Sequence, residues 1–249
     1  MLRALPGDLL EALGFLTRLP LPGPRRTRGP AEALAAFPLA GCVLGLLLAL
    51  LDAGLGRTRL PPFTRDTLVV VALVLLTGGL HLDGLMDACD GLFGGHDPER
   101  RLLIMRDSRV GSFGVLGAAC VILLKLAGLV ALHGPGSNRV AALVLAPTLG
   151  RWALVLAAAL YPLARPDGLG AAFHAGVTPP RMAIAAGATT LIAVAAGRLA
   201  GVLALAVSCA VTWLLGRVVM GKIPGLTGDT YGAIAELNEV ATLFAFALL

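Results

Sequence analysis

The sequence predicts an all-α fold, a polytopic integral membrane helical bundle of about seven transmembrane helices. Of the 249 residues, 57% are hydrophobic and only 14% are charged, and the mean hydropathy is +0.86. A soluble domain carries about a quarter charged residues, because water must solvate its surface. In lipid the backbone must satisfy its own hydrogen bonds, and helices do so within one segment.

The apolar runs set the number of expected spans. They cover roughly 37–55, 67–92, 112–133, 139–162, 182–198, 199–218 and 230–249. About 20 apolar residues cross a bilayer as a helix, so each run is long enough or nearly so. The boundary at Gly197-Arg198 has the thinnest support, because a single arginine separates two alanine-rich runs. We expect residues 1–249 to form one transmembrane catalytic domain.

The N-terminal segment predicts a short amphipathic helix that lies on the membrane. Asp8 and Glu11 interrupt its apolar run, which is not typical of a signal peptide. Its leucines instead recur at helical spacing. They are Leu2, Leu5, Leu9, Leu13 and Leu16. We expect residues 1–35 to form this helix and a basic loop, both cytoplasmic.

The distribution of basic residues predicts an orientation. The net charge is +5 and the sequence pI is about 9.5. Lys and Arg concentrate in alternate loops, which predicts a cytoplasmic N-terminus and a C-terminus on the opposite side. The partner of this charge is therefore the lipid bilayer, and nucleic acid is not expected. The four cysteines form no CxxC pair, so neither a zinc site nor a disulfide framework is expected.

Three acidic residues at the end of the second apolar run form the strongest functional signal. Asp83, Asp87 and Asp90 are spaced i, i+4, i+7, which places them on one helical face. Each carboxylate at membrane depth costs about 2.5–3.5 kcal/mol on the insertion scale, so a compensating charge is expected. Oxygen ligands favour Mg²⁺ or Mn²⁺ over zinc. The alternative is pairing with arginines of neighbouring helices or exposure to cytosolic water.

A cluster of arginines follows this acidic face. Arg106 and Arg109 are candidates for binding phosphate, because the planar guanidinium matches phosphate oxygens. Arg100 and Arg101 lie next to Glu99 and fit a solvated loop equally well.

A second acidic face lies near the C-terminus and includes Asp229, Glu236 and Glu239. Asp229 is expected to enter the membrane from the same side as the first face, so one shared site is expected. Asp229 suits both a helix cap and a ligand. We expect Glu236 and Glu239 to pair with Lys125 or Arg151. His81 fits a core position and a substrate contact equally well.

An acidic, metal-binding face beside arginines predicts chemistry on a pyrophosphate or phosphodiester, with transfer of a phosphate-linked group to an alcohol. A P-loop, HExxH and serine-elbow patterns are absent. A transporter that relays cations is the main alternative from another class. Against it, the acidic residues cluster at one membrane face and no internal repeat is visible.

Three long motifs resemble the cobalamin synthase family. They are His81-Leu82-Asp83-Gly84-Leu85 with Asp87 and Asp90-Gly91, Ile104-Met105-Arg106-Asp107-Ser108-Arg109 with Gly111, and Thr227-Gly228-Asp229-Thr230 with Gly232-Ala233 and Glu236. Three shorter segments also match, so the resemblance covers nearly the whole chain in order. They are Thr17-Arg18-Leu19-Pro20, Phe37-Pro38-Leu39 and Arg165 with Gly168-Leu169-Gly170, the last of which is weak as a bare pattern.

The resemblance implies a multi-pass enzyme of the bacterial inner membrane with a cytoplasmic active site. Such an enzyme is an adenosylcobinamide-GDP ribazoletransferase. It requires Mg²⁺ and joins adenosylcobinamide-GDP to α-ribazole or its 5'-phosphate, releasing GMP. The oligomeric state is left open, an assembly of identical chains included.

The resemblance also suggests roles for individual residues. The expected metal ligands are Asp83, Asp87 and Asp90, and the expected proton acceptor is Asp107 or Asp229. The expected substrate contacts are His81, Arg106, Arg109, Lys125, Thr230 and Glu236.

Two other membrane enzyme families remain as alternatives. The CDP-alcohol phosphotransferases share the opening DxxDG, present as Asp87 to Gly91, but Phe93-Gly94-Gly95 follows where Ala-Arg is expected. A phospholipid-type alcohol phosphotransferase is therefore the second interpretation. A UbiA-type prenyltransferase requires a second Asp-rich repeat, which Thr227-Gly228-Asp229 does not supply.

Overall fold

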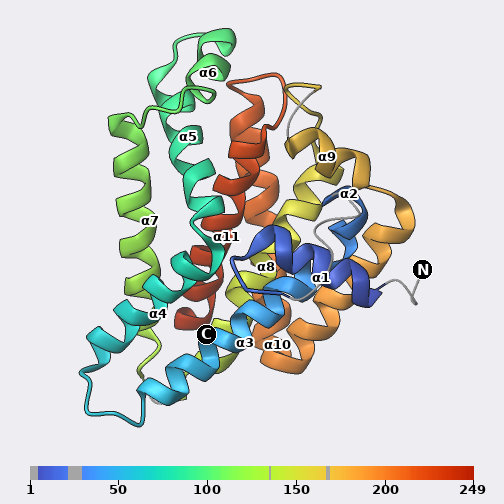
Figure 1. Ribbon diagram of the computed structural model, residues 1–249. Helices are drawn as coiled ribbons and strands as arrows, with labels where there is room; N and C mark the ends of the chain where they lie inside the picture. The colour runs from blue at the N-terminus through green and yellow to red at the C-terminus, as the bar shows by residue number, and fades with distance from the viewer. Residues whose placement is uncertain (1–4, 22–29, 135, 167–168) are drawn as a thin grey trace.

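The computed structural model describes residues 5–21, 30–134, 136–166 and 169–249, and the chain is built from helices (Figure 1). They are α1 (Leu5–Leu16), α2 (Pro30–Ala33), the 3-10 helix η2 (Leu34–Ala36), α3 (Phe37–Leu55), α4 (Pro62–Thr77), α5 (Leu80–Gly94), α6 (Pro98–Ile104), α7 (Ser112–Ala131), α8 (Arg139–Leu160), α9 (Leu169–Gly176), α10 (Pro179–Met220) and α11 (Gly228–Leu248).

The predicted fold class is confirmed, whereas the predicted count of seven spans is not. Within the described residues, five helices are long and apolar enough to cross a membrane. The count becomes six if α4 and α5, which meet at a sharp bend, form one span.

The expected continuous span over 67–92 is wrong. Helices α4 and α5 meet at an angle of 89°. Gly78 and Gly79 between them have φ values of 63° and 70°, in the left-handed region that side chains disfavour. Two consecutive glycines allow this turn, and hydropathy alone does not register it.

Helix α10 is also broken, at the boundary that the sequence left weakest. Arg198 has φ 49° and ψ −129°, which is not helical. A Cβ added to Gly201 would collide with the carbonyl oxygen of Ala193. In a straight helix, residues eight apart are separated by about 12 Å along the axis. The chain therefore bends sharply at Arg198.

Helix α8 forms the centre of the bundle and packs against α3, α10 and α11. Most of its residues are buried, from Arg139 to Ala158. Its contact with α3 is unusually close, because a Cβ added to Gly45 would lie 2.6 Å from the Cα of Val144. Glycine at this position lets the two helix backbones approach each other directly.

The predicted N-terminal amphipathic helix is present as α1. Leu13 and Leu16 are buried in the protein core, so at least part of its apolar side packs against the bundle. Phe15 stacks on Phe37 of α3, with ring centroids 6.1 Å apart. Leu2 and the basic residues of 22–29 lie outside the described residues.

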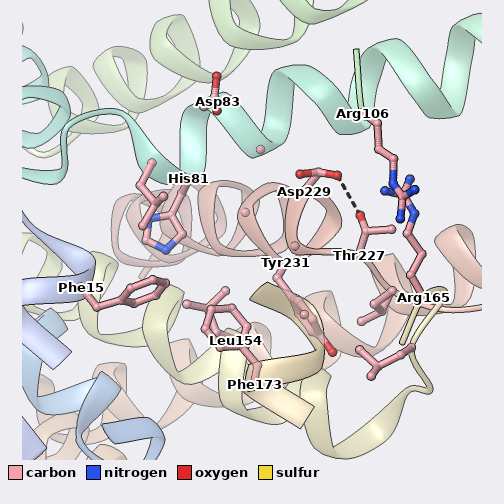
Figure 2. A pocket seen from close by; sticks show the side chains of 17 residues that line it. Phe15, His81, Asp83, Arg106, Leu154, Arg165, Phe173, Thr227, Asp229 and Tyr231 are labelled. Atoms are coloured by element: carbon pink, nitrogen blue, oxygen red, sulfur yellow. Dashed lines mark hydrogen bonds between the residues drawn. The ribbon is translucent and has the colours of Figure 1, made fainter. Parts of the chain in front are cut away.

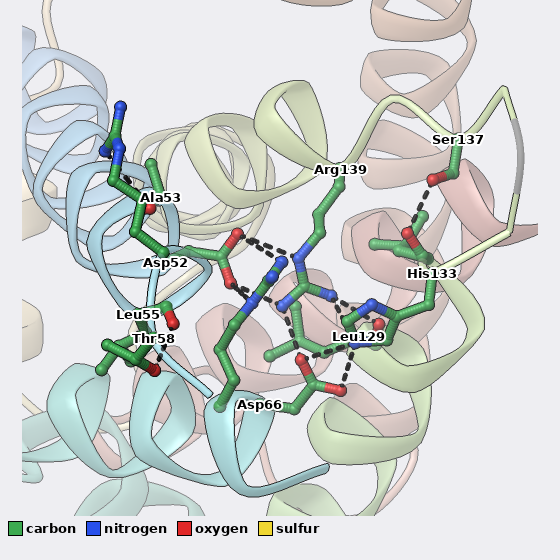
Figure 3. Close-up of polar contacts among 12 residues, drawn as sticks. Asp52, Ala53, Leu55, Thr58, Asp66, Leu129, His133, Ser137 and Arg139 are labelled. Atoms are coloured by element: carbon green, nitrogen blue, oxygen red, sulfur yellow. Dashed lines mark hydrogen bonds and ion pairs between the residues drawn. The ribbon is translucent and has the colours of Figure 1, made fainter. Parts of the chain in front are cut away.

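A cluster of ion pairs joins helix ends far from the α5–α11 region (Figure 3). Arg139 of α8 binds Asp52 of α3 at 2.8 Å and Asp66 of α4 at 2.6 Å. Arg65 adds a second contact to Asp52, at 2.8 Å, and His133 lies 2.9 Å from Asp66. These contacts fix α3, α4, α8 and the loop after α7 relative to one another.

The close approach of α3 and α8 predicts a strong effect of Gly45→Ala. The added methyl group overlaps the backbone of α8, and overpacking of this kind costs about 1–3 kcal/mol. We expect the variant to unfold at lower temperature in detergent. Gly54→Ala in the same helix is the control, because a Cβ there meets nothing within 4 Å. Equal unfolding temperatures for the two variants would contradict this packing.

Candidate active site

The candidate site begins where α5 and α11 cross without intervening side chains. A Cβ added to Gly84 would lie 3.1 Å from the carbonyl oxygen of Asp229 and 3.4 Å from the Cα of Gly232. One added to Gly232 would lie 2.8 Å from the carbonyl oxygen of His81. Because Gly84 meets Asp229 and Gly232 meets His81, the helices run antiparallel. This contact brings the two predicted acidic faces together at the N-terminal ends of their helices, where Asp83 and Asp229 lie.

Three carboxylates gather near this crossing. Asp83 and Asp229 lie close enough to Asp87 for their charges to repel its carboxylate. Among the described residues, no hydrogen bond or ion pair reaches the side chain of Asp83 or of Asp87. The expectation of one shared acidic site therefore agrees with the geometry.

Asp90 has a different environment from Asp83 and Asp87. Its carboxylate oxygens accept hydrogen bonds from the backbone amides of Gly111, at 2.7 Å, and Gly114, at 2.8 Å. Both amides belong to the start of α7, where unpaired N–H groups attract an anion. Glycine at both positions leaves room for the Asp90 carboxylate, which a Cβ there would overlap.

The expected metal-binding face of Asp83, Asp87 and Asp90 is therefore not assembled. In the part of the chain that the structure describes, no three His, Cys, Asp or Glu side chains are placed to hold a metal ion together. The reason for Asp90 is that its oxygens already bind two amides of α7.

A cavity of about 330 Å³ opens beside the crossing (Figure 2). Its walls come from the crossing helices, from the α1 and α9 aromatic residues, and from the loops before α9 and α11. They are Phe15, Leu80, His81, Asp83, Gly84, Arg106, Leu154, Leu163, Arg165, Gly170, Phe173, Leu226, Thr227, Gly228, Asp229, Tyr231 and Gly232.

Two arginines line the cavity across from the carboxylates (Figure 2). Arg106 is the predicted one, and Arg165 is a second that lies close enough to Asp229 to attract its carboxylate. Arg165 also donates a hydrogen bond to the carbonyl oxygen of Leu102. The cavity thus offers planar cations for phosphate oxygens opposite acidic groups.

Asp107 and Arg109, two other predicted site residues, do not line the cavity. They form an exposed ion pair, with Arg109 Nη2 2.7 Å from Asp107 Oδ2. The side-chain hydrogen bond from Arg109 lowers the pKa of Asp107 to about 2. Asp107 is thus ionised at neutral pH and is a weak proton acceptor.

The cap of α11 is Thr227, not Asp229. Thr227 Oγ1 accepts a hydrogen bond from the Thr230 amide at 3.2 Å, and Thr230 Oγ1 accepts one from the Thr227 amide at 2.8 Å. Asp229 lies in the first turn, where it accepts a hydrogen bond from the Thr227 hydroxyl at 3.2 Å. The cap interpretation of Asp229 is therefore wrong. Thr230, an expected substrate contact, is fully buried in this capping box instead.

Deeper in the bundle, four charged side chains form a buried network. Lys125 Nζ lies 2.6 Å from Glu236 Oε2 and also binds Glu239, which in turn binds Arg151. All four residues are less than 8% exposed, and the predicted pairing is confirmed. Lys125 and Glu236, expected as substrate contacts, do not line the cavity and pair with each other instead.

His81 connects this network to the cavity. It is 4% exposed, and its Nδ1 lies 3.5 Å from Arg151 Nη2. It also lines the cavity, so the two interpretations of His81, core residue and cavity residue, both agree with the geometry.

Several cavity residues were missed from the sequence as site residues. Arg165 lies in a turn-rich segment whose pattern alone is weak. Phe15 and Phe173 are far apart in sequence, and their neighbourhood in the cavity arises only from packing of α1 against α9.

Together, the fold and the cavity define a polytopic helical protein with a cavity that carboxylates and arginines line. The model of the cobalamin-5-phosphate synthase family matches residues 8–247. The chain belongs to this family, and it is therefore a transferase of cobalamin biosynthesis.

Curated relatives extend over nearly the whole chain. A protein of Roseiflexus sp. (strain RS-1), named adenosylcobinamide-GDP ribazoletransferase, is 44% identical and covers 96% of this chain and 88% of its own. Proteins of the same name from Desulforamulus reducens, 39% identical, and Pseudomonas paraeruginosa, 40% identical, each cover 97% of this chain and 96% and 98% of their own. No solved structure matches the chain at a significant level.

The buried network predicts that Lys125→Met destabilises the protein severely. The change leaves Glu236 without its partner and Glu239 with only Arg151. Removing one partner of a buried pair costs about 3–5 kcal/mol. Thermal unfolding in detergent measures the loss, and the double variant Lys125→Met/Glu236→Gln should recover part of it. The control is Arg59→Met, at an exposed cation of the α3–α4 loop. A Lys125→Met protein as stable as this control would refute the network.

Proposed function

We propose that the chain joins adenosylcobinamide-GDP to α-ribazole, or to its 5'-phosphate, and releases GMP. Support comes from the curated relatives, whose name states a ribazole transfer to adenosylcobinamide-GDP. The observation that carries the proposal is the cavity itself, in which Asp83 and Asp229 face Arg106 and Arg165.

The reaction suits this arrangement of charges. The ribazole 3'-hydroxyl attacks the phosphorus attached to the cobinamide side, a new P–O bond forms, and the bond to GMP breaks. Asp229 accepts the hydroxyl proton, because it lies at the cavity wall while Asp107 does not. Arg106 and Arg165 hold the phosphate oxygens and orient the pyrophosphate.

We further propose that the site uses Mg²⁺ bound through Asp83 and Asp87 together with the substrate phosphates. Their oxygens suit this cation, and the described residues supply the side chains of Asp83 and Asp87 with no ion pair or hydrogen bond. Mg²⁺ is commonly held by one or two carboxylates together with substrate phosphates, which agrees with the lack of a three-ligand cluster. When bound, the ion neutralises the phosphate oxygens and stabilises the leaving group. Asp90 then positions the start of α7 rather than ligating the metal.

The bilayer and the inner membrane location belong to the same proposal. Arg106 and Arg165 lie at the cavity end of the bundle, on the side where the positive-inside rule puts the cytoplasm. Both nucleotide-linked substrates would then enter from the cytoplasm.

The metal proposal predicts that GMP formation requires Mg²⁺ and Asp83. Purified protein in lipid is mixed with adenosylcobinamide-GDP and α-ribazole, with Mg²⁺ or with EDTA, and GMP is measured. Asp83→Asn should lower turnover by about 100-fold or more.

The matched control is Glu99→Gln, an exposed acid of α6 outside the cavity, which should keep full turnover. GMP formation at the wild-type rate in the presence of EDTA, or by the Asp83→Asn variant, would contradict the metal assignment. No GMP from the wild type under any condition would reject the function as a whole.

The choice of proton acceptor gives a separate prediction. Asp229→Asn should reduce turnover by about 100-fold or more, since general base catalysis contributes roughly 10²–10⁴-fold. Asp107→Asn should keep most of the activity. Because the pKa of Asp107 is about 2, this group stays ionised above pH 4, and its removal should not shift the pH profile of turnover in that range. If the pH profile of turnover in the Asp107→Asn variant lost its fall at acidic pH, the base would be Asp107 instead.

A further inference from the structure

The cavity has an aromatic end that the phosphate chemistry does not use. Phe15 of α1, Phe173 of α9 and Tyr231 of α11 line it, together with Leu154 of α8. The Phe173 ring lies 5.8 Å from Phe15 and 5.6 Å from Tyr231, both in edge-to-face arrangements. Three elements thus contribute one aromatic wall.

Asp229 lies between this wall and the arginines. Figure 2 shows Phe15, Leu154 and Phe173 on one side of Asp229, and Arg106 and Arg165 on the other. A ligand that spans the cavity would therefore present an apolar ring at one end, a hydroxyl in the middle and a phosphate at the other.

Tyr231 adds an independent sign of a ligand. It is fully buried, it lines the cavity, and its hydroxyl has no hydrogen-bond partner among the described residues. Buried polar groups in folded proteins nearly always have a partner, so this hydroxyl beside the cavity is a donor that a bound ligand could use. His81 is the other side chain at this end that can donate a hydrogen bond.

We propose that the aromatic end binds the base of α-ribazole, which is 5,6-dimethylbenzimidazole, and this rests on the proposed function. The base is flat and apolar, and it carries two methyl groups and one imine nitrogen that accepts a hydrogen bond. Aromatic and aliphatic walls suit its faces and methyl groups. With the base there, the ribose hydroxyls reach the carboxylates and the pyrophosphate of the second substrate meets the arginines.

The other parts of the two substrates fit this end poorly. Guanine carries several donors and acceptors along its edges, and within the described residues the aromatic end offers only His81 and Tyr231 as polar side chains. Burying its remaining polar groups unpaired costs free energy. The corrin ring with its side chains is too large for a cavity of about 330 Å³.

Binding measurements on the full-length protein in lipid test this assignment. The intrinsic fluorescence of the benzimidazole reports α-ribazole binding, and equilibrium dialysis followed by corrin absorbance reports adenosylcobinamide-GDP binding. Phe173→Leu keeps an apolar side chain but removes the ring, and it should weaken α-ribazole binding roughly tenfold, since base–aromatic stacking is lost. Its affinity for adenosylcobinamide-GDP should stay unchanged. Phe93→Leu, at an exposed ring outside the cavity, should alter neither affinity.

A second measurement does not depend on variants. Free 5,6-dimethylbenzimidazole should inhibit competitively against α-ribazole and not against adenosylcobinamide-GDP. Competition with adenosylcobinamide-GDP instead, or a Phe173→Leu variant that weakens only that substrate, would assign the aromatic end to guanine and overturn the proposal. Ring-dependent binding of α-ribazole without any GMP formed by the wild type would leave this subsite standing and reject the proposed function.

Discussion

The arrangement of the site depends on the direct backbone contact between α5 and α11. Because Gly84 and Gly232 carry no side chains, Asp83 and Asp229 come to one cavity wall from helices far apart in sequence. Helix α5 begins at Leu80, directly after Gly78-Gly79, where the chain turns by 89° away from α4. A larger residue at Gly84 or Gly232 would push the two helices apart and so increase the distance between Asp83 and Asp229.

Charged residues are few in this chain, and they fall into two groups. One group forms buried ion pairs, and the other consists of carboxylates without a partner. Glu236 and Glu239 lie deep in the bundle and have Lys125 and Arg151 as partners. The side chains of Asp83 and Asp87 have no such partner within the described residues, and Asp83 lines the cavity. A carboxylate that a membrane protein keeps without internal compensation is most simply explained by a cation or substrate that supplies it.

The sequence predicted what depends on composition and local spacing. Hydropathy identified most of the helices, and the scarcity of buried cations predicted the pairing of Glu239 with Lys125 and Arg151. It did not predict the break at Gly78-Gly79, because backbone φ leaves no trace in hydropathy. It did not predict the amides that occupy Asp90, nor the meeting of Phe15 with Phe173, since both arise from tertiary packing.

The ion cluster of Figure 3 has a consequence for how substrates reach the cavity. Arg139 in that cluster begins α8, and Leu160, close to the cavity residue Leu163, ends it about 30 Å away along the helix axis. The ion pairs of Arg139 with Asp52 and Asp66 thus hold the helices together at one end of the bundle. Because the cavity lies at the opposite end, a conformational change that widened it would leave these ion pairs intact.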